Sequence, residues 1–388
     1  MEFREVIKFI KSKYSSQKTI HLHEPVFHGN EKKYITDAID STFVSSIGKY
    51  VDRAELMISK LTGTSNSTAV VNGTSGIQVA LQLAGVNEGD EVLTQALTFV
   101  ATSNAILYNK ASPVFIDVDL DTMGMSPSSL RNFLESNVEK RDGKSFNKNS
   151  GRQISACVPM HTFGIPCRIE EIKKICIEWD IVLIEDCAES LGSYVNNQHT
   201  GTFGELAILS FNGNKLITTG GGGMIITNDE RLAKHAKHIT TTSKVPHPFE
   251  FVHDEVGYNY RMPNLNAALG CAQMERLNEF LAIKSVIAEK WKFFFHDSNI
   301  EFMKPLIGSK ANNWLNTIAL ESKSERDYFL KHTNENGVMT RPIWTLMSKL
   351  EMFKHYENDG LKNSINLEER VVNIPSSVPD GALSLLGI

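Results

Sequence analysis

The chain has 388 residues, of which 41% are hydrophobic and 22% are charged, and its formal net charge is −5. This is the composition of a globular protein, and the length suffices for one large domain with a smaller one. The negative charge argues against non-specific binding of nucleic acid, which requires a strongly basic surface.

The cysteines and the hydropathy of the chain bear on its compartment. The five cysteines are an odd number and form no Cys-x-x-Cys pair, which favours a reducing compartment over a disulfide framework or a zinc site. Residues 1–16 mix acidic and basic side chains and lack the apolar core of a secretory signal. No apolar run is long enough to span a bilayer. We therefore expect a cytoplasmic protein with no metal site and no membrane or nucleic-acid partner.

The hydrophobic periodicity of the first 65 residues predicts mainly helices. We expect helices over residues 2–14, 31–40 and 52–61, an extended segment over 21–29 and a loop over 43–51. These elements precede the first strand of the main sheet.

From residue 67 onward, strand patterns alternate with helix patterns. The predicted strands cover residues 69–71, 91–94, 113–117, 156–160, 181–184 and 206–211. The predicted helices cover residues 76–84, 99–107, 126–135 and 168–179. The polar segment 141–152 predicts a loop. Alternation at this spacing indicates an α/β fold with a mostly parallel sheet and helices on both faces, and ligands of such sheets bind beyond the carboxyl ends of the strands.

The pattern changes near residue 265. A long helical stretch over 265–295 leads into shorter strands and helices. We therefore expect a large domain over residues 15–265 and a smaller α+β domain over 266–388, with the N-terminal segment packing partly against the small domain.

One lysine stands in an unusual setting. Lys215 lies between the apolar run 206–211 and four consecutive glycines, within the stretch SFNGNKLITTGGGG that begins at Ser210. Glycine lets the backbone approach a neighbour closely, and an amine in a crowded, partly dry place has a lowered pKa and can form a Schiff base. Ser210 and Asn212 flank the lysine as hydrogen-bonding groups. On this stretch alone, a surface lysine in a glycine-rich hairpin is the better interpretation.

Glycines and hydroxyls follow the predicted strand 69–71. Gly73, Thr74 and Ser75 precede the next predicted helix. The free N–H groups of a helix start, together with two hydroxyls, bind an anion, most naturally a phosphate. The sequence is neither a Walker loop nor a Gly-x-Gly-x-x-Gly motif. A plain helix cap explains the same residues about as well.

Two further strands are followed by residues that can bind a cofactor ring. Phe99 follows strand 91–94 and can stack on a flat ring, although a core phenylalanine is the better interpretation in isolation. Asp186 follows an apolar strand in the sequence IVLIEDCAES. A carboxylate there needs a cationic or N–H partner, such as a protonated pyridine nitrogen; the alternative is an aspartate that caps a helix. Glu189, three residues further on, can reach the same place or complete a capping pattern.

These features together match the requirements of one cofactor. A phosphate cradle, a ring stacker, a carboxylate for a ring nitrogen and a Schiff-base lysine are what pyridoxal 5′-phosphate (PLP) requires. Each simpler explanation is reasonable by itself, but a coincidence of all four is hard to accept.

The chain resembles the fold-type I PLP enzymes, and within them the DegT/DnrJ/EryC1/StrS sugar aminotransferases. The similar positions span about residues 23–375, and the motifs are NGTSG, IEDCAES, SFNGNK with GGGG, and GYNYRMPNLNAALG. The resemblance implies a mixed, mostly parallel seven-stranded sheet in the large domain. It also implies that Lys215 forms the Schiff base with PLP, that Asp186 pairs with the pyridinium nitrogen and that Phe99 stacks on the ring. Glu189 matches a position near the cofactor's phenolic oxygen or the substrate.

The same resemblance assigns the phosphate site. It implies that Thr74, Ser75 and Ser210 hold the phosphate, with Gly73 in the same loop. It further implies that Asn259 reaches the phosphate bound by a neighbouring subunit, so that the protein is a homodimer with shared active sites.

Two stretches narrow the resemblance. Residues 23–46 and 340–353 are most similar to enzymes that aminate C4 of UDP-4-keto-6-deoxy-N-acetylglucosamine. The four-glycine run, in which many relatives carry an acidic residue second, points the same way. The implied reaction moves an amino group from glutamate to the C4 keto group of a nucleotide sugar, for surface-glycan biosynthesis.

Four residues are candidates for substrate contact. Arg261 and Arg341 can bind a diphosphate through the planar guanidinium, and Trp344 can stack on uracil. His161 can move protons, although a packed histidine is the stronger interpretation. The basic run 234–238, on a predicted helix, is interpreted as a solvated face.

Several alternatives stay open at this point. The nucleotide can be GDP- or dTDP-linked, and the keto group can lie at C3. A PLP-dependent sugar dehydratase is disfavoured, because that branch of the family carries histidine in place of the lysine. A non-catalytic PLP-binding regulator lacks support, because no helix-turn-helix or basic DNA-reading segment is present.

Overall fold

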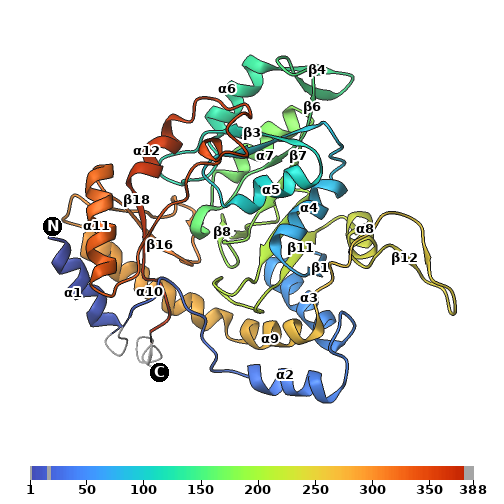
Figure 1. The fold of residues 1–388 in the computed structure, drawn as a ribbon, viewed down its shortest axis with the longest axis horizontal. Coiled ribbons are helices and arrows are strands. Elements are labelled where there is room, and N and C mark those ends of the chain that lie inside the picture. Colours follow the sequence, from blue (N-terminus) through green and yellow to red (C-terminus); the bar gives the residue numbers. More distant parts are fainter. Residues whose placement is uncertain (1, 15–18, 380–388) are drawn as a thin grey trace.

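The larger part of the molecule is built on one large sheet (Figure 1), in which seven of the nine strands follow one another across the sheet. The structure is a computed structural model that describes residues 2–14 and 19–379. In order across the sheet, the strands are β1 (Asn66–Val70), β11 (Gly223–Thr227), β10 (Leu206–Ser210), β7 (Val182–Asp186), β6 (Gln153–Val158), β2 (Glu91–Gln95) and β3 (Ser112–Ile116). The pairs from β10 to β3 are parallel, whereas β11 runs antiparallel to both β1 and β10. The predicted α/β fold with a mixed, mostly parallel sheet is confirmed.

Helices cover both faces of this sheet, because alternate side chains of a buried strand point to opposite sides. Val92 packs into one hydrophobic cluster and its neighbour Leu93 into another. The first face carries α4 (Gly73–Leu83), α5 (Val100–Tyr108) and α8 (Glu230–Thr240). The second face carries α6 (Pro127–Asn137) and α7 (Ile169–Glu178), and towards β1 it carries α3 (Lys49–Thr62) and α9 (Asn264–Glu275).

A hairpin occupies residues 138–147, in part where the sequence predicted a polar loop over 141–152. β4 (Val138–Arg141) pairs antiparallel with β5 (Lys144–Asn147), and β5 pairs with β6. Asp142 and Gly143 make the turn with φ values of 51° and 73°, the left-handed geometry that a two-residue hairpin turn favours. The loop prediction was wrong, because the polar composition masked the Asp-Gly turn signal.

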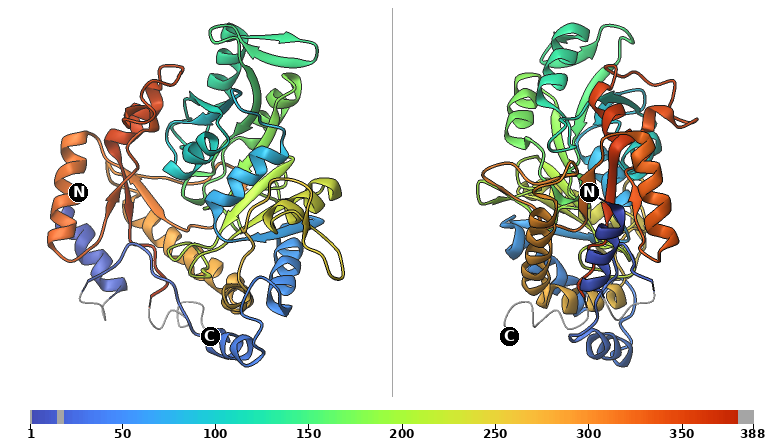
Figure 2. Two further views of the ribbon diagram at one scale, coloured as in Figure 1. Left: turned by 45° about the vertical axis from the view of Figure 1, so that its right-hand side comes forward. Right: turned by 90° about the vertical axis from the view of Figure 1, so that its left-hand side faces the viewer.

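A second, antiparallel sheet lies in the C-terminal part (Figure 2). Its strands, in order, are β14 (Glu301–Phe302), β16 (Asn316–Ala319), β18 (Val371–Ile374) and β17 (Arg341–Pro342). One core joins it to α1 (Phe3–Lys13), α10 (Leu277–Phe295) and α11 (Lys323–Glu335). The helical stretch predicted over 265–295 consists of two helices, α9 and α10, which meet at Arg276. The division into domains near residue 265 stays a prediction.

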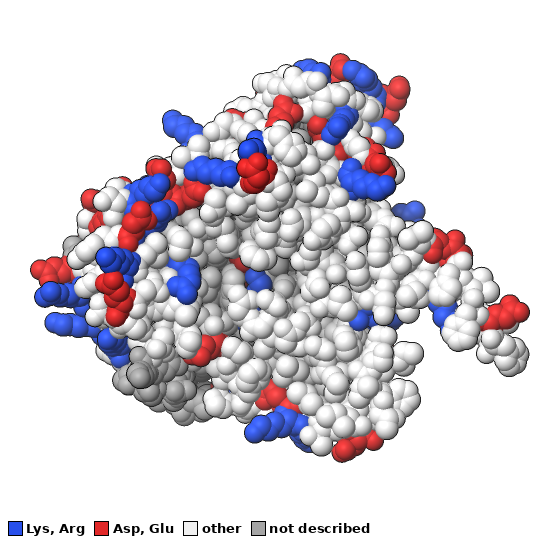
Figure 3. All heavy atoms as spheres, in the orientation of Figure 1, with Lys and Arg blue, Asp and Glu red and all other residues white. Residues whose placement is uncertain are grey.

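Short elements connect these parts. They are α2 (Glu31–Asp40), β8 (Tyr194–Val195), β9 (Gln198–His199), β12 (Lys244–Val245), β13 (Val252–His253), β15 (Ser309–Lys310), α12 (Lys362–Arg370) and the 3₁₀ turns η1 (Thr162–Gly164) and η2 (Met347–Lys349). β15 pairs with β8, so a segment of the C-terminal part joins the region that follows β7. Figure 3 shows a hollow near the centre of this face, with few charged atoms around it. No helix in the described residues combines the length and the hydropathy that a bilayer crossing requires.

Candidate active site

Neighbouring parallel strands bring two predicted site residues to one edge of the large sheet. Asp186 ends β7 and Ser210 ends β10, and Asp186 lies opposite Ile208 in the register of this pair. The buried side chain of Asp186 accepts hydrogen bonds from Thr102 Oγ1 (2.6 Å) and from the backbone N–H of Ala188 (3.1 Å). This edge therefore carries a buried carboxylate one strand away from a hydroxyl.

Lys215 and Glu189 form an ion pair at the same edge. Lys215 Nζ lies 3.0 Å from Glu189 Oε1, and Glu189 Oε2 accepts a hydrogen bond from the N–H of Phe163 (2.9 Å). Burial raises the pKa of Glu189, and the charge of Lys215 offsets part of this rise. The charge of Asp186 is close enough to raise the same pKa further, so the two carboxylates and the lysine share one site.

Trp314 provides a second partner for the lysine. Lys215 Nζ lies 4.1 Å from the centre of its indole ring, and Trp314 Nε1 donates a hydrogen bond to the carbonyl oxygen of Asn214 (2.7 Å). The buried side chain of Asn312 fixes the segment, because its Nδ2 donates to the carbonyl oxygens of Glu189 (2.8 Å) and Leu191 (2.9 Å). An ammonium on an indole face is a favourable cation–π contact.

Trp314 was missed by the sequence analysis. It follows β15 in the stretch NNWLN, about 100 residues after Lys215, and has no charged or glycine-rich motif beside it. Only the pairing of β15 with β8 brings this stretch to the sheet edge.

Aromatic side chains extend from this point towards Phe99. The ring centre of Phe163 lies 6.4 Å from that of Trp314 and 4.7 Å from that of Trp344, and Trp344 lies 6.4 Å from Phe99. Phe99 is 50% exposed, which contradicts the alternative of a core phenylalanine. The structure therefore leaves the Phe99 ring available to a ligand.

The predicted phosphate cradle lies at the start of α4. The helix begins at Gly73 rather than at residue 76, because the side chain of Asn72 accepts a hydrogen bond from the N–H of Ser75 (2.8 Å) and caps it. The first N–H groups of a helix have no acceptor within the helix. A Cβ atom on Gly73 would lie 3.2 Å from the Cβ of Ser210, so the cradle and the Ser210 hydroxyl are adjacent.

A side chain would meet different surroundings at two positions of the glycine run. A Cβ atom on Gly223 would lie 2.8 Å from the backbone carbon of Asn72, closer than side chains approach. A Cβ atom on Gly221 would have one neighbour within 4 Å, the Val71 carbonyl oxygen at 3.8 Å. The close approach at Gly223 therefore holds β11 against the cradle, whereas Gly221, the second glycine of the run, has room for a side chain.

Three predicted residues have exposed side chains in the single chain. Asn212 and Asn259 are exposed, although the N–H of Asn212 donates to Ser210 Oγ (3.4 Å) and its carbonyl oxygen accepts from the N–H of Lys215 (3.0 Å). Arg341 is exposed in β17, and its guanidinium donates hydrogen bonds to Asn334 Oδ1 (2.9 Å) and to the carbonyl oxygen of Thr340 (2.8 Å). Their roles towards cofactor, substrate or a neighbouring subunit stay predictions.

Arg261 is buried in an ion pair. Its Nη2 lies 2.8 Å from Glu55 Oε1, which also accepts a hydrogen bond from the N–H of Ala69 (2.9 Å). The other terminal nitrogen, Nη1, is buried and has no hydrogen-bond partner in the part of the chain that the structure describes. These contacts hold the guanidinium against α3 and β1, and a contact with substrate stays a prediction.

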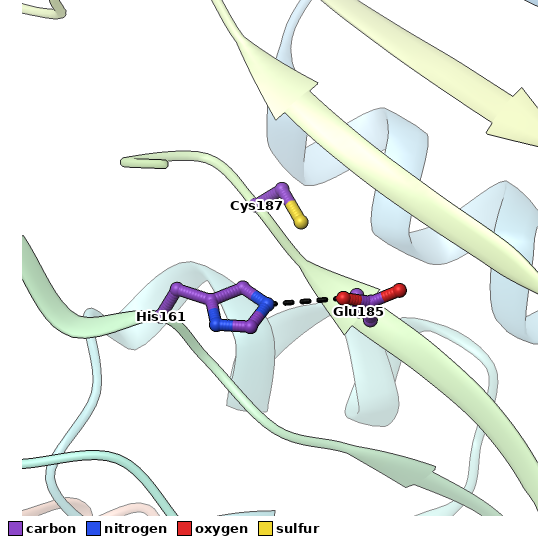
Figure 4. Close-up of side chains that lie close together, drawn as sticks. All are labelled: His161, Glu185 and Cys187. Atoms are coloured by element: carbon purple, nitrogen blue, oxygen red, sulfur yellow. Dashed lines mark hydrogen bonds and ion pairs between the residues drawn. The ribbon is translucent and has the colours of Figure 1, made fainter. Parts of the chain in front are cut away.

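His161 lies inside the protein and is not part of the open edge (Figure 4). Its ring is fully buried, its Nε2 lies 3.1 Å from Glu185 Oε2, and its Nδ1 accepts a hydrogen bond from the N–H of Cys167 (3.2 Å). Because Nδ1 accepts a hydrogen bond, Nε2 carries the ring proton and donates a hydrogen bond to Glu185. This fixed tautomer corrects the assignment of His161 to the substrate and agrees with the packed histidine that the sequence favoured.

Glu185 completes this buried pair. Its carboxylate also accepts hydrogen bonds of 2.7–2.8 Å from the backbone N–H groups of Gly201, Phe203 and Gly204. Burial by itself would raise the pKa of Glu185, but the hydrogen bonds from His161 and the backbone outweigh it and lower the pKa. Cys187 lies beside the pair (Figure 4), and burial raises the pKa of its thiol to about 11. Both ring nitrogens of His161 and both carboxylate oxygens of Glu185 have hydrogen-bond partners within the protein.

The sequence of residues 26–379 matches one known family. The chain belongs to the DegT/DnrJ/EryC1/StrS aminotransferase family. It is 35% identical over 337 residues to EpsN of Bacillus subtilis (strain 168), whose name describes a pyridoxal phosphate-dependent aminotransferase; this match covers 87% of the chain and 84% of EpsN. It is 33% identical over 360 residues to GDP-perosamine synthase of Escherichia coli O157:H7, which covers 92% of the chain and 93% of that protein.

The fold of this DegT/DnrJ/EryC1/StrS aminotransferase is also that of a solved structure. Helicobacter pylori PseC, an aminotransferase involved in the biosynthesis of pseudoaminic acid, matches with a TM-score of 0.84 and 21% identity over 95% of the chain and 99% of PseC. The predicted family and the fold-type I PLP fold are both confirmed.

The aminotransferases of this family depend on PLP, and the residues of the site fit that cofactor. The two hydrogen bonds that Asp186 accepts come from neutral groups, Thr102 and Ala188. A buried carboxylate of this kind needs a cationic partner, and a protonated ring nitrogen meets this need. The cradle at α4 suits the phosphate, and Lys215 presents an amine beside Glu189.

Proposed function

We propose that this PLP-dependent aminotransferase moves an amino group from glutamate to the C4 keto group of UDP-4-keto-6-deoxy-N-acetylglucosamine. The observation that carries the proposal is the common site of Lys215, Glu189 and Asp186 at the carboxyl edge of the sheet, next to the start of α4. A lysine, a ring-facing carboxylate and a phosphate cradle in one place are the groups that transamination needs.

Each residue of the site has a separate task. When bound, PLP supplies an aldehyde that condenses with amines and a ring that takes up electrons. Asp186 keeps a proton on the ring nitrogen through a charge-assisted hydrogen bond. With PLP bound, Lys215 would be the base that takes the proton from the amine-bearing carbon of the donor, and in the second half of the reaction it would deliver a proton to the acceptor carbon that receives the nitrogen. Glu189, 3.0 Å away, orients the Lys215 amine.

The surroundings hold the cofactor and exclude water. Gly73, Thr74, Ser75 and Ser210 bind the phosphate, and Phe99 covers one face of the ring. Asn212 adds a hydrogen bond at the edge of the site. Asn259 of a second copy reaches the same phosphate, so the active enzyme is a homodimer.

Two observations support a nucleotide sugar as the amino acceptor. GDP-perosamine synthases match over nearly the full length of the chain, and their name denotes an aminated sugar on a nucleotide. The ring centres of Trp344 and the half-exposed Phe99 lie 6.4 Å apart, and such rings suit the apolar faces of a sugar or base. Arg341 and Arg261 are the candidates for the diphosphate.

A second candidate substrate is a GDP-linked 4-keto-6-deoxy sugar. The identity to GDP-perosamine synthases favours it, whereas the stretches 23–46 and 340–353 favour the UDP-linked sugar. Both candidates need the same residues at the PLP end of the site, so they differ in how the nucleotide and the N-acetyl group of the sugar are bound.

A panel of 4-keto sugar nucleotides separates the candidates. The purified protein, PLP and glutamate are incubated with UDP-, GDP- and dTDP-linked substrates, and the products are identified by mass spectrometry. We expect the amino sugar from the UDP-linked N-acetylglucosamine derivative at the highest kcat/KM. A preference for the GDP-linked sugar would replace the first candidate by the second, and no amino product from any substrate would contradict the proposed function.

A further inference from the structure

A buried lysine lies in the C-terminal part, outside the large sheet. Lys284 belongs to α10, and it is only 1% exposed. Its Nζ donates hydrogen bonds to the carbonyl oxygens of Ser376 (2.5 Å) and Trp314 (3.2 Å), and it lies 3.5 Å from the carbonyl oxygen of Asn313. All three acceptors are main-chain atoms, so the ammonium acts on the backbone of two segments that are far apart in the sequence.

One of these segments makes a tight turn before Trp314. Asn313 has a φ value of 52°, in the left-handed region that residues other than glycine seldom adopt. The N–H of Trp314 donates to Asn312 Oδ1 (2.9 Å), and the carbonyl oxygen of Trp314 accepts from Lys284. A backbone conformation of this kind persists only where the surrounding structure holds it. The direction of the Trp314 side chain therefore depends on contacts on both sides of its backbone.

The indole ring carries this geometry to the candidate active site. Its centre lies 4.1 Å from Lys215 Nζ, and its Nε1 donates a hydrogen bond to the carbonyl oxygen of Asn214 (2.7 Å). Asn214 directly precedes Lys215, so the ring contacts the lysine at its amine and the backbone beside it. A displacement of the turn would therefore move the ring relative to Lys215.

We propose that Lys284 is a positioning residue: by holding the carbonyl oxygen of Trp314, it keeps the indole ring against Lys215. The proposal rests on the proposed function, in which the Lys215 amine moves a proton and must be held in one place. Small displacements of a reacting group cost much of the rate. Lys284 acts on the reaction through Trp314.

The alternative is that Lys284 only joins α10 to the chain near Ser376. The N–H of Ser376 donates to the carbonyl oxygen of Leu22 (2.8 Å), so this junction also includes the N-terminal segment. Burial disfavours a charged amine and lowers the pKa of Lys284 to about 7, whereas a methionine of similar length would fill the space without this cost. The two explanations differ in whether the effect of Lys284 on the rate depends on Trp314.

A double-mutant cycle separates the two explanations. The enzyme loaded with PLP is mixed with glutamate, without a sugar nucleotide, and the absorbance of the cofactor gives the rate constant of the first half-reaction. Lys284→Met should lower this rate constant several-fold, up to the about tenfold loss that we expect for Trp314→Leu. In the Trp314→Leu background, Lys284→Met should change it by less than about twofold. Lys292→Met, which alters a half-exposed lysine of the same helix, should keep the wild-type rate.

A spectroscopic readout does not depend on turnover. The enzyme is labelled with 5-fluorotryptophan, and the fluorine resonances of Trp314 and Trp291 are assigned with the Trp314→Phe and Trp291→Phe variants. Trp291 lies on α10 itself, so its resonance reports on the helix. Lys284→Met should shift the Trp314 resonance and leave the Trp291 resonance in place, and Lys292→Met should leave the Trp314 resonance in place.

Three results would overturn the proposal. They are rate losses that multiply in the double variant, an unchanged rate in Lys284→Met, and a Trp314 resonance that shifts no more than the Trp291 resonance. If the wild type does not react with glutamate, the proposed function is contradicted instead, and the fluorine spectra still test the position of the ring. If Lys284→Met does not fold, Lys284→Gln replaces it with the same criteria.

Discussion

Segments that follow strands of the large sheet place the charged groups of the candidate site, whereas the C-terminal part adds two tryptophans. Asp186, Glu189 and Lys215 follow directly from the ends of β7 and β10. Trp314 and Trp344 come from segments that no strand of the large sheet contains. In the proposed function the charged groups would carry out the chemistry, and the Trp314 ring lies against the lysine.

The two regions also hold their residues in different ways. At the sheet edge, Glu189 is fixed by a backbone N–H and an ion pair, so its position follows from the strand that precedes it. Two neighbours hold the Trp314 segment in place. Asn312 Nδ2 donates to the Glu189 carbonyl oxygen, and Lys284 Nζ donates to the Trp314 carbonyl oxygen (3.2 Å). A motif can therefore identify the first kind of residue, and only packing identifies the second.

Removal of the lysine should have the largest effect. Lys215→Ala loses both the Schiff base and the group that moves the proton, so kcat/KM should fall at least about 1,000-fold. The measurement is transamination with glutamate and the preferred sugar nucleotide. Lys110→Ala, which removes an exposed lysine paired with Glu88, should keep the wild-type rate. Turnover of Lys215→Ala at the wild-type rate would refute its assignment.

The glycine run tests the geometry of the sheet edge. Gly223→Ala places a Cβ atom 2.8 Å from the backbone of Asn72, and we expect a loss of about 1–3 kcal/mol in the free energy of unfolding together with weaker PLP binding. Gly221→Ala, where the nearest neighbour is at 3.8 Å, should change stability by less than about 0.5 kcal/mol. Urea unfolding and PLP titration check both variants. Equal losses in the two would show that the close approach is not the cause.

The indole face tests the contribution of the C-terminal part. Trp314→Leu removes a cation–π contact worth up to about 2 kcal/mol when it is desolvated, so kcat/KM should fall about tenfold. Trp314→Phe keeps an aromatic face but, like Leu, loses the hydrogen bond to Asn214. If Phe restores most of the rate, the ring is responsible; if Phe and Leu are equally impaired, the hydrogen bond is.

Lys284 offers a test that depends on pH. It is buried in α10, and burial lowers the pKa of its amine to about 7. The unfolded chain has an ordinary lysine pKa near 10.4. Between pH 7 and this value, Lys284 therefore carries a proton in the unfolded chain but not in the native protein. The free energy of unfolding of the wild type relative to Lys284→Met should therefore rise with pH above 7, by up to about 1.4 kcal/mol per pH unit, and stay level below it.

A lysine on the same helix serves as the control for this pH dependence. Lys292 is 51% exposed beside Glu289, so the difference between the wild type and Lys292→Met should not vary with pH in this range. The measurement is urea unfolding followed by circular dichroism from pH 6 to pH 9. Parallel curves for the wild type and Lys284→Met would contradict a lowered pKa in the native protein.

The strand and helix patterns of the amino-acid sequence predicted the mostly parallel sheet, and the resemblance of its motifs predicted the family. The polar residues near the strand ends could be proposed as site residues because a buried strand is a continuous apolar run, and a polar residue after it lies at the sheet edge. A local turn signal within a polar stretch was harder to recognise, as the Asp-Gly turn of the β4–β5 hairpin shows.

Which side chains contact one another depends on the tertiary structure. The pairing of β15 with β8 brings Trp314 to Lys215 across about 100 residues, and the hairpin of β12 and β13 brings Asp254 and Glu255 to the histidines of α8. The structure also shows that the His161 side chain points inwards to Glu185. Contacts between distant segments depend on how whole elements pack, and no periodicity or spacing within one segment records them.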